Sequence, residues 1–251
     1  MSGSVRGVLV TGASRGTGAA VARAFADLGD RVAVHYGSSK ALAEEVAGSL
    51  PGDGHAVVQA DLTDPEAVRR MVDAAADELG RLDVLVNNAG VFIAQPPMET
   101  SYEDWQETWA QTLATNLTAA ANTTYCAIPH LLAAGGGAVV NVSSRGAFRG
   151  EPRNPAYGAS KAGLNAFGQS MAVALAPHGI TVGTVAPGFV QTEMARETLT
   201  GPGGDAVRAQ SPFGRVARPE EVAAAVVWLA SPEARFSTGT IIDVNGASYL
   251  R

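Results

Sequence analysis

The stretch VRGVLVTGASRGTG (residues 5–18) decides the fold. A Val-rich apolar run leads into three glycines, and a helical pattern follows. Strand, glycine-rich turn and helix in this order are typical of a dinucleotide-binding turn. Gly12 permits the tight turn, Gly16 lets the backbone approach a pyrophosphate, and Gly18 lets the helix pack closely on the sheet.

The same turn predicts where phosphates would bind. Free backbone N–H groups and the positive end of the following helix attract anions. We therefore expect a dinucleotide at the residues of this turn: Gly12, Ser14, Arg15, Gly16 and Thr17. The alternative interpretation is a glycine-rich turn that binds no ligand.

The pattern of the first unit continues along the chain. Val-rich runs that suit strands buried on both faces occupy residues 5–11, 31–36, 55–60, 82–86, 137–143, 179–186 and 239–244. Helical patterns lie between them, near residues 17–28, 39–50, 64–79, 102–133, 155–177 and 219–230. Repeated strand–helix alternation predicts an α/β fold, with a parallel sheet covered by helices on both faces.

Composition excludes several classes of protein. The 251 residues carry a net charge of -6, a single cysteine and four scattered histidines. One cysteine forms no internal disulfide, and the histidines form no zinc-ligand motif, so we expect no metal. The chain lacks a secretory leader pattern and a long apolar run, and its acidic balance disfavours nucleic acid. We expect a cytoplasmic protein without membrane or nucleic-acid partners.

We expect residues 1–251 to form a single domain, because no linker or low-complexity segment interrupts them. The least regular stretch is residues 188–217. It is either a mobile lid over a site at the carboxyl ends of the strands or a tolerated surface loop, and we favour the lid.

Lysine is rare, and each of the two lysines follows a tyrosine by four residues. Tyr157 and Lys161 would share one face of a helix. Ser144, thirteen residues before Tyr157, follows a predicted strand and would face them. A nearby ammonium favours the phenolate, so it would adapt a tyrosine to proton transfer during reduction of a carbonyl group. Ser143 is the competing serine, but alternation along the strand points it to the other face.

The second copy, Tyr36 and Lys40, follows the second predicted strand. Enzymes that select NAD usually place an acid at this point to bind the ribose 2′-hydroxyl. No acid is present here, whereas Arg15, Ser38 and Lys40 could bind a 2′-phosphate. The sequence therefore favours NADP(H) over NAD(H). The alternative for Lys40 is a solvated residue in the first turn of a helix.

Over nearly its full length the chain resembles the short-chain dehydrogenase/reductase (SDR) family. The matching pieces are residues 11–18, Asp61-Leu62, Asn87-Asn-Ala-Gly90, Asn116, Ser144, Tyr157 with Lys161, Pro187-Gly188 with Thr192, and Pro219-Glu-Glu221. The resemblance implies a doubly wound Rossmann fold with a seven-stranded parallel sheet. It also implies a catalytic tetrad of Asn116, Ser144, Tyr157 and Lys161, with Tyr157 as the acid/base.

Within this resemblance, Lys161 would also hold the nicotinamide ribose, and Asn116 would position a water for a proton relay. Further cofactor-binding positions would be Tyr36, Asp61, Leu62, Asn88, Ala89, Gly90, Pro187, Gly188, Val190 and Thr192. Structural interpretations stay open for some of them: Asn116 could serve its own helix and Asp61 could be a cap. For Asn87 we favour a role in holding strands together.

The subgroup of the family that fits best is the 3-oxoacyl-acyl-carrier-protein reductases. Residues 133–137 and 171–176 nevertheless contain no basic residue that would attract an acidic carrier protein. We therefore favour a small ketone or alcohol as the substrate. Arg145, Arg149 and Arg153 either bind a carboxylate or phosphate near the site or belong to a solvated loop.

Two rival functions are a 3-oxoacyl-acyl-carrier-protein reductase and a dinucleotide-binding module without catalysis. Enoyl reductases and sugar epimerases of the same fold fit less well in Tyr–Lys spacing and in length. The family resemblance also implies a homodimer or homotetramer. The long helices 102–133 and 155–177 are the expected contacts between subunits.

Overall fold

The computed structural model describes residues 5–251 and contains one seven-stranded parallel sheet. The strands are β1 (Gly7–Val10), β2 (Arg31–Tyr36), β3 (Ala56–Gln59), β4 (Val84–Asn87), β5 (Gly137–Val142), β6 (Ile180–Pro187) and β7 (Ile241–Val244). Their order is β3-β2-β1-β4-β5-β6-β7, and every neighbouring pair is parallel. The predicted α/β class and the seven-stranded sheet are confirmed.

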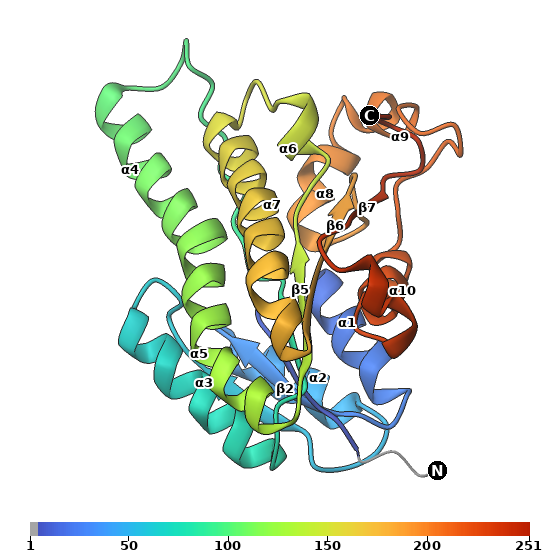
Figure 1. Cartoon of the computed structure of the whole chain (residues 1–251). Coiled ribbons are helices and arrows are strands. Elements are labelled where there is room, and N and C mark those ends of the chain that lie inside the picture. Colours follow the sequence, from blue (N-terminus) through green and yellow to red (C-terminus); the bar gives the residue numbers. More distant parts are fainter. Residues whose placement is uncertain (1–4) are drawn as a thin grey trace.

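Helices cover both faces of the sheet (Figure 1). One face carries α1 (Gly16–Ala26), α2 (Lys40–Ser49) and α10 (Pro219–Leu229), and the other carries α3 (Pro65–Leu79), α5 (Ala119–Ala133) and α7 (Pro155–Leu175). The remaining helical segments are α4 (Tyr102–Leu113), η1 (Ala114–Thr118), α6 (Gly146–Arg149), η2 (Ala176–His178), α8 (Glu193–Thr200), α9 (Gly204–Arg208) and η3 (Pro232–Ser237).

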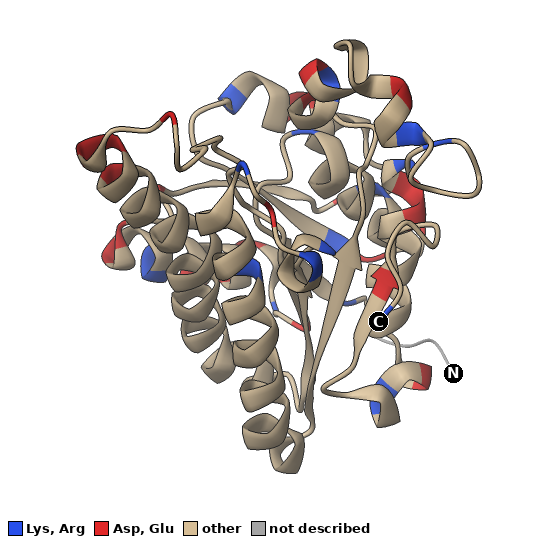
Figure 2. Ribbon diagram, turned by 90° about the horizontal axis from the view of Figure 1, so that it is seen from above, with Lys and Arg blue, Asp and Glu red and all other residues tan. Residues whose placement is uncertain are grey.

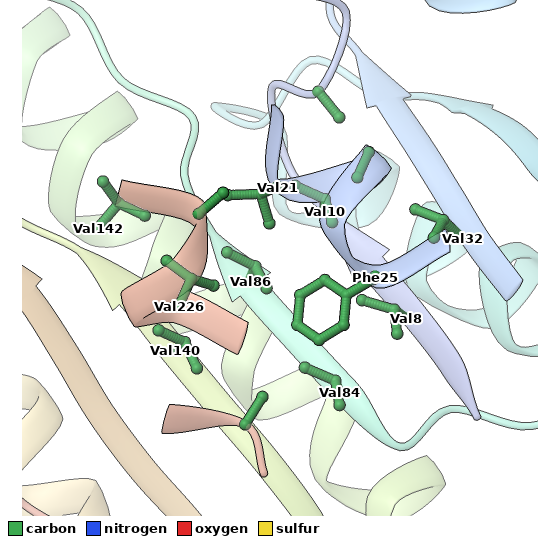
Figure 3. Packing of buried hydrophobic residues seen from close by; sticks show 14 of the residues in the cluster. Val8, Val10, Val21, Phe25, Val32, Val84, Val86, Val140, Val142 and Val226 are labelled. Atoms are coloured by element: carbon green, nitrogen blue, oxygen red, sulfur yellow. The ribbon is translucent and has the colours of Figure 1, made fainter. Parts of the chain in front are cut away.

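Alternation along β1 explains why its residues are apolar without interruption. Val8 and Val10 point into the core under α1 and α10, whereas Leu9 belongs to the core on the opposite face. Figure 3 shows the first of these cores, where Phe25 of α1 lies among valines from several strands. A strand buried on both faces must be apolar at every position.

Local signals place two helix starts where the sequence predicts them. The Asp64 side chain accepts hydrogen bonds from the backbone N–H groups of Glu66 (2.9 Å) and Ala67 (3.2 Å) at the start of α3. At the start of α10, the Glu221 carboxylate accepts a hydrogen bond of 2.8 Å from the backbone N–H of Arg218. Each contact satisfies an N–H group that the helix leaves free.

Two predicted segments differ from the structure. Residues 102–133 form a continuous run of helix, but the π-helical turn η1 separates α4 from α5. The predicted irregular stretch 188–217 contains two helices, α8 and α9. The spacing of apolar residues in the sequence does not reveal the π-helical turn, because such a turn differs from an α-helical turn by only one residue. The two helices are short, and Gly201–Gly204 between them hides their pattern.

The strand order sets the position of the site. β2 and β4 lie on opposite sides of β1, so the connections after β1 and β4 run in opposite directions and leave a crevice at the carboxyl ends of these strands. Segments α6, α8 and α9 lie at the same end of the molecule (Figure 1). Acidic and basic residues are interspersed on the view from above (Figure 2).

Candidate active site

Two adjoining cavities lie at the carboxyl edge of the sheet. The larger has a volume of about 540 Å³ and is lined by the glycine-rich turn and the ends of β2, β3 and β4. The smaller, of about 170 Å³, is lined by Ser144, Tyr157 and Lys161 and by residues that follow β6. Asn88, Gly90 and Thr192 line both, so the cavities form one cleft.

The glycine-rich turn lines the larger cavity with backbone. Gly12 and Gly16 have φ values of +63° and +57°, a region that favours glycine. A Cβ atom on Gly18 would lie only 2.4 Å from the carbonyl oxygen of Gly12. Gly16, Thr17 and Gly18, the first residues of α1, line the cavity. This cradle fits the pyrophosphate of a dinucleotide.

A buried histidine that the sequence reasoning missed supports this turn. His35 on β2 accepts a hydrogen bond at Nδ1 from the Gly12 N–H (3.0 Å), while Nε2 lies 3.2 Å from the carbonyl oxygen of Ala60. Nε2 must therefore carry the proton, and the ring is neutral. Burial lowers the pKa of His35 to about 4, in agreement with this state. No recognised motif would have pointed to it.

Most of the predicted cofactor positions line the cleft. The larger cavity is lined by Gly12, Ser14, Arg15, Gly16, Thr17, Ser38, Asp61, Leu62, Asn88, Ala89, Gly90 and Thr192, and the smaller one by Pro187, Gly188 and Val190. Tyr36 and Lys40 are exceptions. Tyr36 packs against the core, and the Lys40 ammonium lies 3.5 Å from Glu44 on the exposed side of α2.

The three predicted asparagine and aspartate positions are held by hydrogen bonds. Asn88 Nδ2 donates to the carbonyl oxygens of Thr11 (2.9 Å) and Gly12 (3.1 Å), and so fixes the glycine-rich turn. Asn87 Nδ2 donates to Asn141 Oδ1 (2.9 Å), which confirms that it holds β4 to β5. Asp61 Oδ1 accepts from the Thr63 N–H (2.9 Å) in the turn before α3, whose cap is Asp64, and Asp61 also lines the cavity.

The structure brings Tyr157 and Lys161 together on α7, beside the end of β5. Lys161 Nζ lies 5.8 Å from the centre of the Tyr157 ring and donates a hydrogen bond of 2.9 Å to the carbonyl oxygen of Val142. Burial lowers the pKa of Lys161 to about 8. The ring edge of Phe92 packs against Tyr157 at 4.7 Å between ring centres.

Tyr157 is half-buried on the cavity wall, and desolvation of its phenol raises its pKa. A hydrogen bond with Ser144 acts in the opposite direction, and the carboxyl group of Glu151 raises the pKa further. The lowering expected from Lys161 is therefore not found in this structure, where desolvation dominates the pKa of Tyr157 because it penalises the phenolate.

Both candidate serines line the smaller cavity, so strand alternation does not separate them. The reason is that β5 ends at Val142, one residue before Ser143. Hydrogen bonding separates them instead. Ser143 Oγ donates to the backbone carbonyl of Lys161 (3.2 Å) and anchors α7, whereas Ser144 Oγ accepts from the Gly146 N–H (3.0 Å) beside Tyr157.

Asn116 is buried inside the π-helical turn η1. Its Oδ1 accepts from the Val91 N–H (2.8 Å), and its Nδ2 donates to the Val91 carbonyl (3.0 Å) and to Ser160 Oγ (3.1 Å). A Cβ atom on Gly90 would lie 3.1 Å from Asn116 Oδ1 and 3.5 Å from Lys161 Nζ. Asn116 therefore joins the segment after β4 to α7 close to Lys161.

The three arginines between Ser144 and Tyr157 are already engaged. Arg145 is buried and donates hydrogen bonds to Ser248 Oγ (2.5 Å) and Gln210 Oε1 (2.6 Å). Arg149 also donates to Gln210 Oε1, at 3.3 Å. The exposed Arg153 lies 3.9 Å from Glu99. These contacts tie the loop after β5 to the segment 188–217 and to the end of the chain.

Over the part of the chain that the structure describes, residues 5–251, no cluster of His, Cys, Asp and Glu side chains could hold a metal ion. None of the helices in these residues is both long enough and apolar enough to cross a membrane.

Comparison with known proteins agrees with this geometry. The model of a family described as enoyl-(acyl carrier protein) reductase matches residues 12–247. The 3-oxoacyl-[acyl-carrier-protein] reductase FabG of Vibrio cholerae is 37% identical, with 96% of each chain covered. D-threitol dehydrogenase of Mycolicibacterium smegmatis is 39% identical, over 97% of this chain and 92% of that one. Cis-4-hydroxycyclohexanecarboxylate dehydrogenase of Sinomonas cyclohexanicum is 40% identical, over 96% and 95%.

A solved structure also matches closely. The crystal structure of a dehydrogenase/reductase from Sinorhizobium meliloti has a TM-score of 0.88 and 31% identity, and the match covers 98% of this chain and 95% of that one. The fold and the cleft define a Rossmann-type oxidoreductase that acts on CH–OH groups with a nicotinamide cofactor. The chain belongs to the short-chain dehydrogenase/reductase family.

Proposed function

We propose that this protein is an NADP(H)-dependent oxidoreductase that interconverts small ketones and alcohols, with Tyr157 as the acid/base. The observation that carries the proposal is the pair of Tyr157 and the buried Lys161 beside Ser144, on the wall of the smaller cavity, which adjoins the larger one. A general acid at this point lies next to the space where the glycine-rich turn would hold a dinucleotide.

The residues divide the work of carbonyl reduction as follows. The bound nicotinamide supplies the hydride that is added to the carbonyl carbon. Tyr157 donates its phenolic proton to the carbonyl oxygen as negative charge develops there, and Ser144 donates a hydrogen bond to the same oxygen. Oxidation of the alcohol reverses both transfers, with Tyr157 as the base. Lys161 favours the phenolate whenever its ammonium is charged.

Asn116 is a positioning residue in this proposal. Its amide holds the segment after β4 against α7, and so it sets the distance between the two walls of the cleft. The segment 188–217 serves as a lid. In support of this role, Thr192, Met194 and Thr198 line the smaller cavity, and Gln210 is hydrogen-bonded to Arg145 below it.

The preference for NADP(H) rests on the end of β2. Gly37 and Ser38 line the larger cavity there, and no acid stands among residues 35–40 to bind a ribose 2′-hydroxyl. Arg15 lines the same cavity and carries the positive charge that a 2′-phosphate requires. Lys40 is secondary, because it does not line this cavity.

A second candidate function is reduction of 3-oxoacyl chains on a carrier protein. Its support is the 37% identity to the FabG of Vibrio cholerae over 96% of the chain. Against it stands the absence of basic residues in 133–137 and 171–176. We also infer a homodimer or homotetramer. In support of this inference, α5 and α7 expose the large side chains Tyr125 and Val173.

Tyr157→Phe tests the mechanism, because it removes the transferable proton and keeps the ring against Phe92. We expect kcat for reduction of a panel of small ketones to fall by roughly 100- to 10,000-fold. NADPH binding, followed by the fluorescence of the tryptophans, should be unchanged. Undiminished turnover in this variant, or a wild-type enzyme that reduces no ketone with either nicotinamide, would refute the proposal.

A further inference from the structure

Glu151 is a carboxylate on the wall of the substrate cavity that the sequence reasoning did not single out. It lies in the loop between α6 and α7 and lines the smaller cavity together with Ser144, Tyr157 and Lys161. Its side chain is only 18% exposed. A half-buried acid beside a proton-transfer residue needs a physical explanation, since burying a carboxylate is costly.

The Glu151 carboxylate lacks a hydrogen-bond donor within residues 5–251. The nearest cationic atom is Arg149 Nε, 4.0 Å from Oε1, which is too long for a hydrogen bond. Arg145 directs its guanidinium to Ser248 and Gln210 instead. Partial burial removes some of the water around this carboxylate, and this desolvation raises the pKa of Glu151.

The surrounding backbone is shaped to leave room for this carboxylate. A Cβ atom on Gly146 would lie 2.8 Å from Glu151 Oε1 and 2.9 Å from its Cγ, so a larger residue at position 146 would displace the Glu151 side chain from this position. The loop itself is closed by a hydrogen bond of 2.9 Å from the Asn154 N–H to the Glu151 carbonyl, directly before α7. The hydrogen bond fixes the backbone of Glu151, and Gly146 leaves space for its side chain at the cavity wall.

The charges around the cavity restrict what can satisfy Glu151. A substrate carboxylate would meet like charge there, and a substrate ammonium would meet the like charges of Arg145 and Arg149. A neutral hydroxyl group donates a hydrogen bond to the carboxylate without either penalty. Glu151 lines the same cavity as Tyr157, and its charge acts on the Tyr157 phenol, so a hydroxyl group that reaches Glu151 would lie close to the carbon that faces Tyr157.

We propose that Glu151 is a specificity-determining residue that accepts a hydrogen bond from a second hydroxyl group of the substrate, adjacent to the reacting carbon. The substrate class is then α-hydroxyketones and the vicinal diols formed from them. Reduction adds a hydride to the carbonyl carbon and the Tyr157 proton to its oxygen, and the second hydroxyl is unchanged. This inference rests on the proposed function, because it uses the same site.

The test compares ketones that differ only in the second hydroxyl. The pairs are 3-hydroxybutan-2-one with butan-2-one, and 2-hydroxycyclohexanone with cyclohexanone, each reduced by the full-length enzyme with NADPH. We expect the wild type to prefer the hydroxyketone by about 10-fold or more in kcat/KM, as for a hydrogen bond to a charged acceptor. Glu151→Leu should abolish this preference, mainly through a higher KM for the hydroxyketone, so that the two members of each pair have nearly equal kcat/KM.

Glu151→Gln is the conservative variant and should lose part of the preference. The matched control is Glu99→Gln, because Glu99 is an exposed acid in a neighbouring loop, and it should keep the wild-type ratio. NADPH titration by tryptophan fluorescence checks that each variant is folded. Equal kcat/KM for both members of each pair in the wild type, or an unchanged ratio in both Glu151 variants, would overturn the inference and leave the proposed function standing. Absence of all ketone reduction would refute the proposed function itself.

Discussion

The spacing Tyr-x-x-x-Lys occurs twice in this chain, and the two copies lie in opposite surroundings. Tyr36 ends β2, Lys40 begins α2, and the lysine side chain is 68% exposed beside Glu44. Tyr157 and Lys161 lie on one helix, where Lys161 is only 4% exposed and donates a hydrogen bond to the end of β5. The Tyr-x-x-x-Lys spacing alone therefore does not identify a pair that can transfer protons. Burial of the lysine at the carboxyl edge of the sheet distinguishes the second pair and supports the proposal that this pair transfers protons.

The largest expected difference between the two lysines is in turnover. Lys161→Met keeps much of the volume and removes the ammonium, so we expect kcat to fall by roughly 100-fold or more because the phenolate loses its stabilising charge. The measurement is steady-state ketone reduction with NADPH. Lys40→Met is the matched control and should keep kcat within about twofold. Equal losses of kcat in the Lys161 and Lys40 variants would contradict the proposal that only the buried lysine supports turnover.

The same contrast predicts a difference in stability against pH. Burial lowers the pKa of Lys161 to about 8, below its ordinary value of 10.5, so the unfolded state binds more protons between these two values. The Lys161 ammonium therefore lowers the free energy of unfolding below about pH 8. This free energy rises again as pH increases from about 8 to 10.5. Urea unfolding should show a free-energy difference between Lys161→Met and wild type that shrinks by up to roughly 3 kcal/mol over this range. A difference independent of pH would show that Lys161 is not desolvated.

The smallest expected effects concern cofactor choice. Arg15 lines the larger cavity and Lys40 does not, so we expect Arg15→Ala to weaken NADPH binding by about 10-fold and Lys40→Ala by less than about threefold. NADH binding should change little in either variant, because NADH lacks the 2′-phosphate. Fluorescence titration measures all four affinities. Tighter binding of NADH than of NADPH by the wild type would contradict the assignment.

Much of this architecture was predictable from local patterns. The glycine-rich turn, the Val-rich runs and the start of α3 at Asp64 depend on neighbouring residues, and the structure has each of them. The family resemblance brought together Asn116, Ser144, Tyr157 and Lys161, and the structure places Ser144, Tyr157 and Lys161 around one cavity, with Asn116 beside them. Turns, strands and helix starts depend mainly on residues close together in the chain, so they can be predicted without knowing which distant residues they contact.

Other features escaped the sequence because they depend on contacts between distant segments. The π-helical turn around Asn116 differs from an α-helix by one residue per turn, and α8 and α9 are short helices next to glycines. The roles of His35 and Glu151 arise where separate loops meet. A lone histidine in a strand and a lone acid in a loop carry no recognisable spacing.

The sequence by itself determined the class of fold, the nucleotide-binding turn and the residue types available for proton transfer, because these depend on periodicity and on residues close together in the chain. Tertiary structure alone decided which lysine is buried, which serine faces Tyr157 and which carboxylate lacks a donor. The physical reason is that desolvation and hydrogen-bond partners depend on neighbours that the fold brings together from distant parts of the chain.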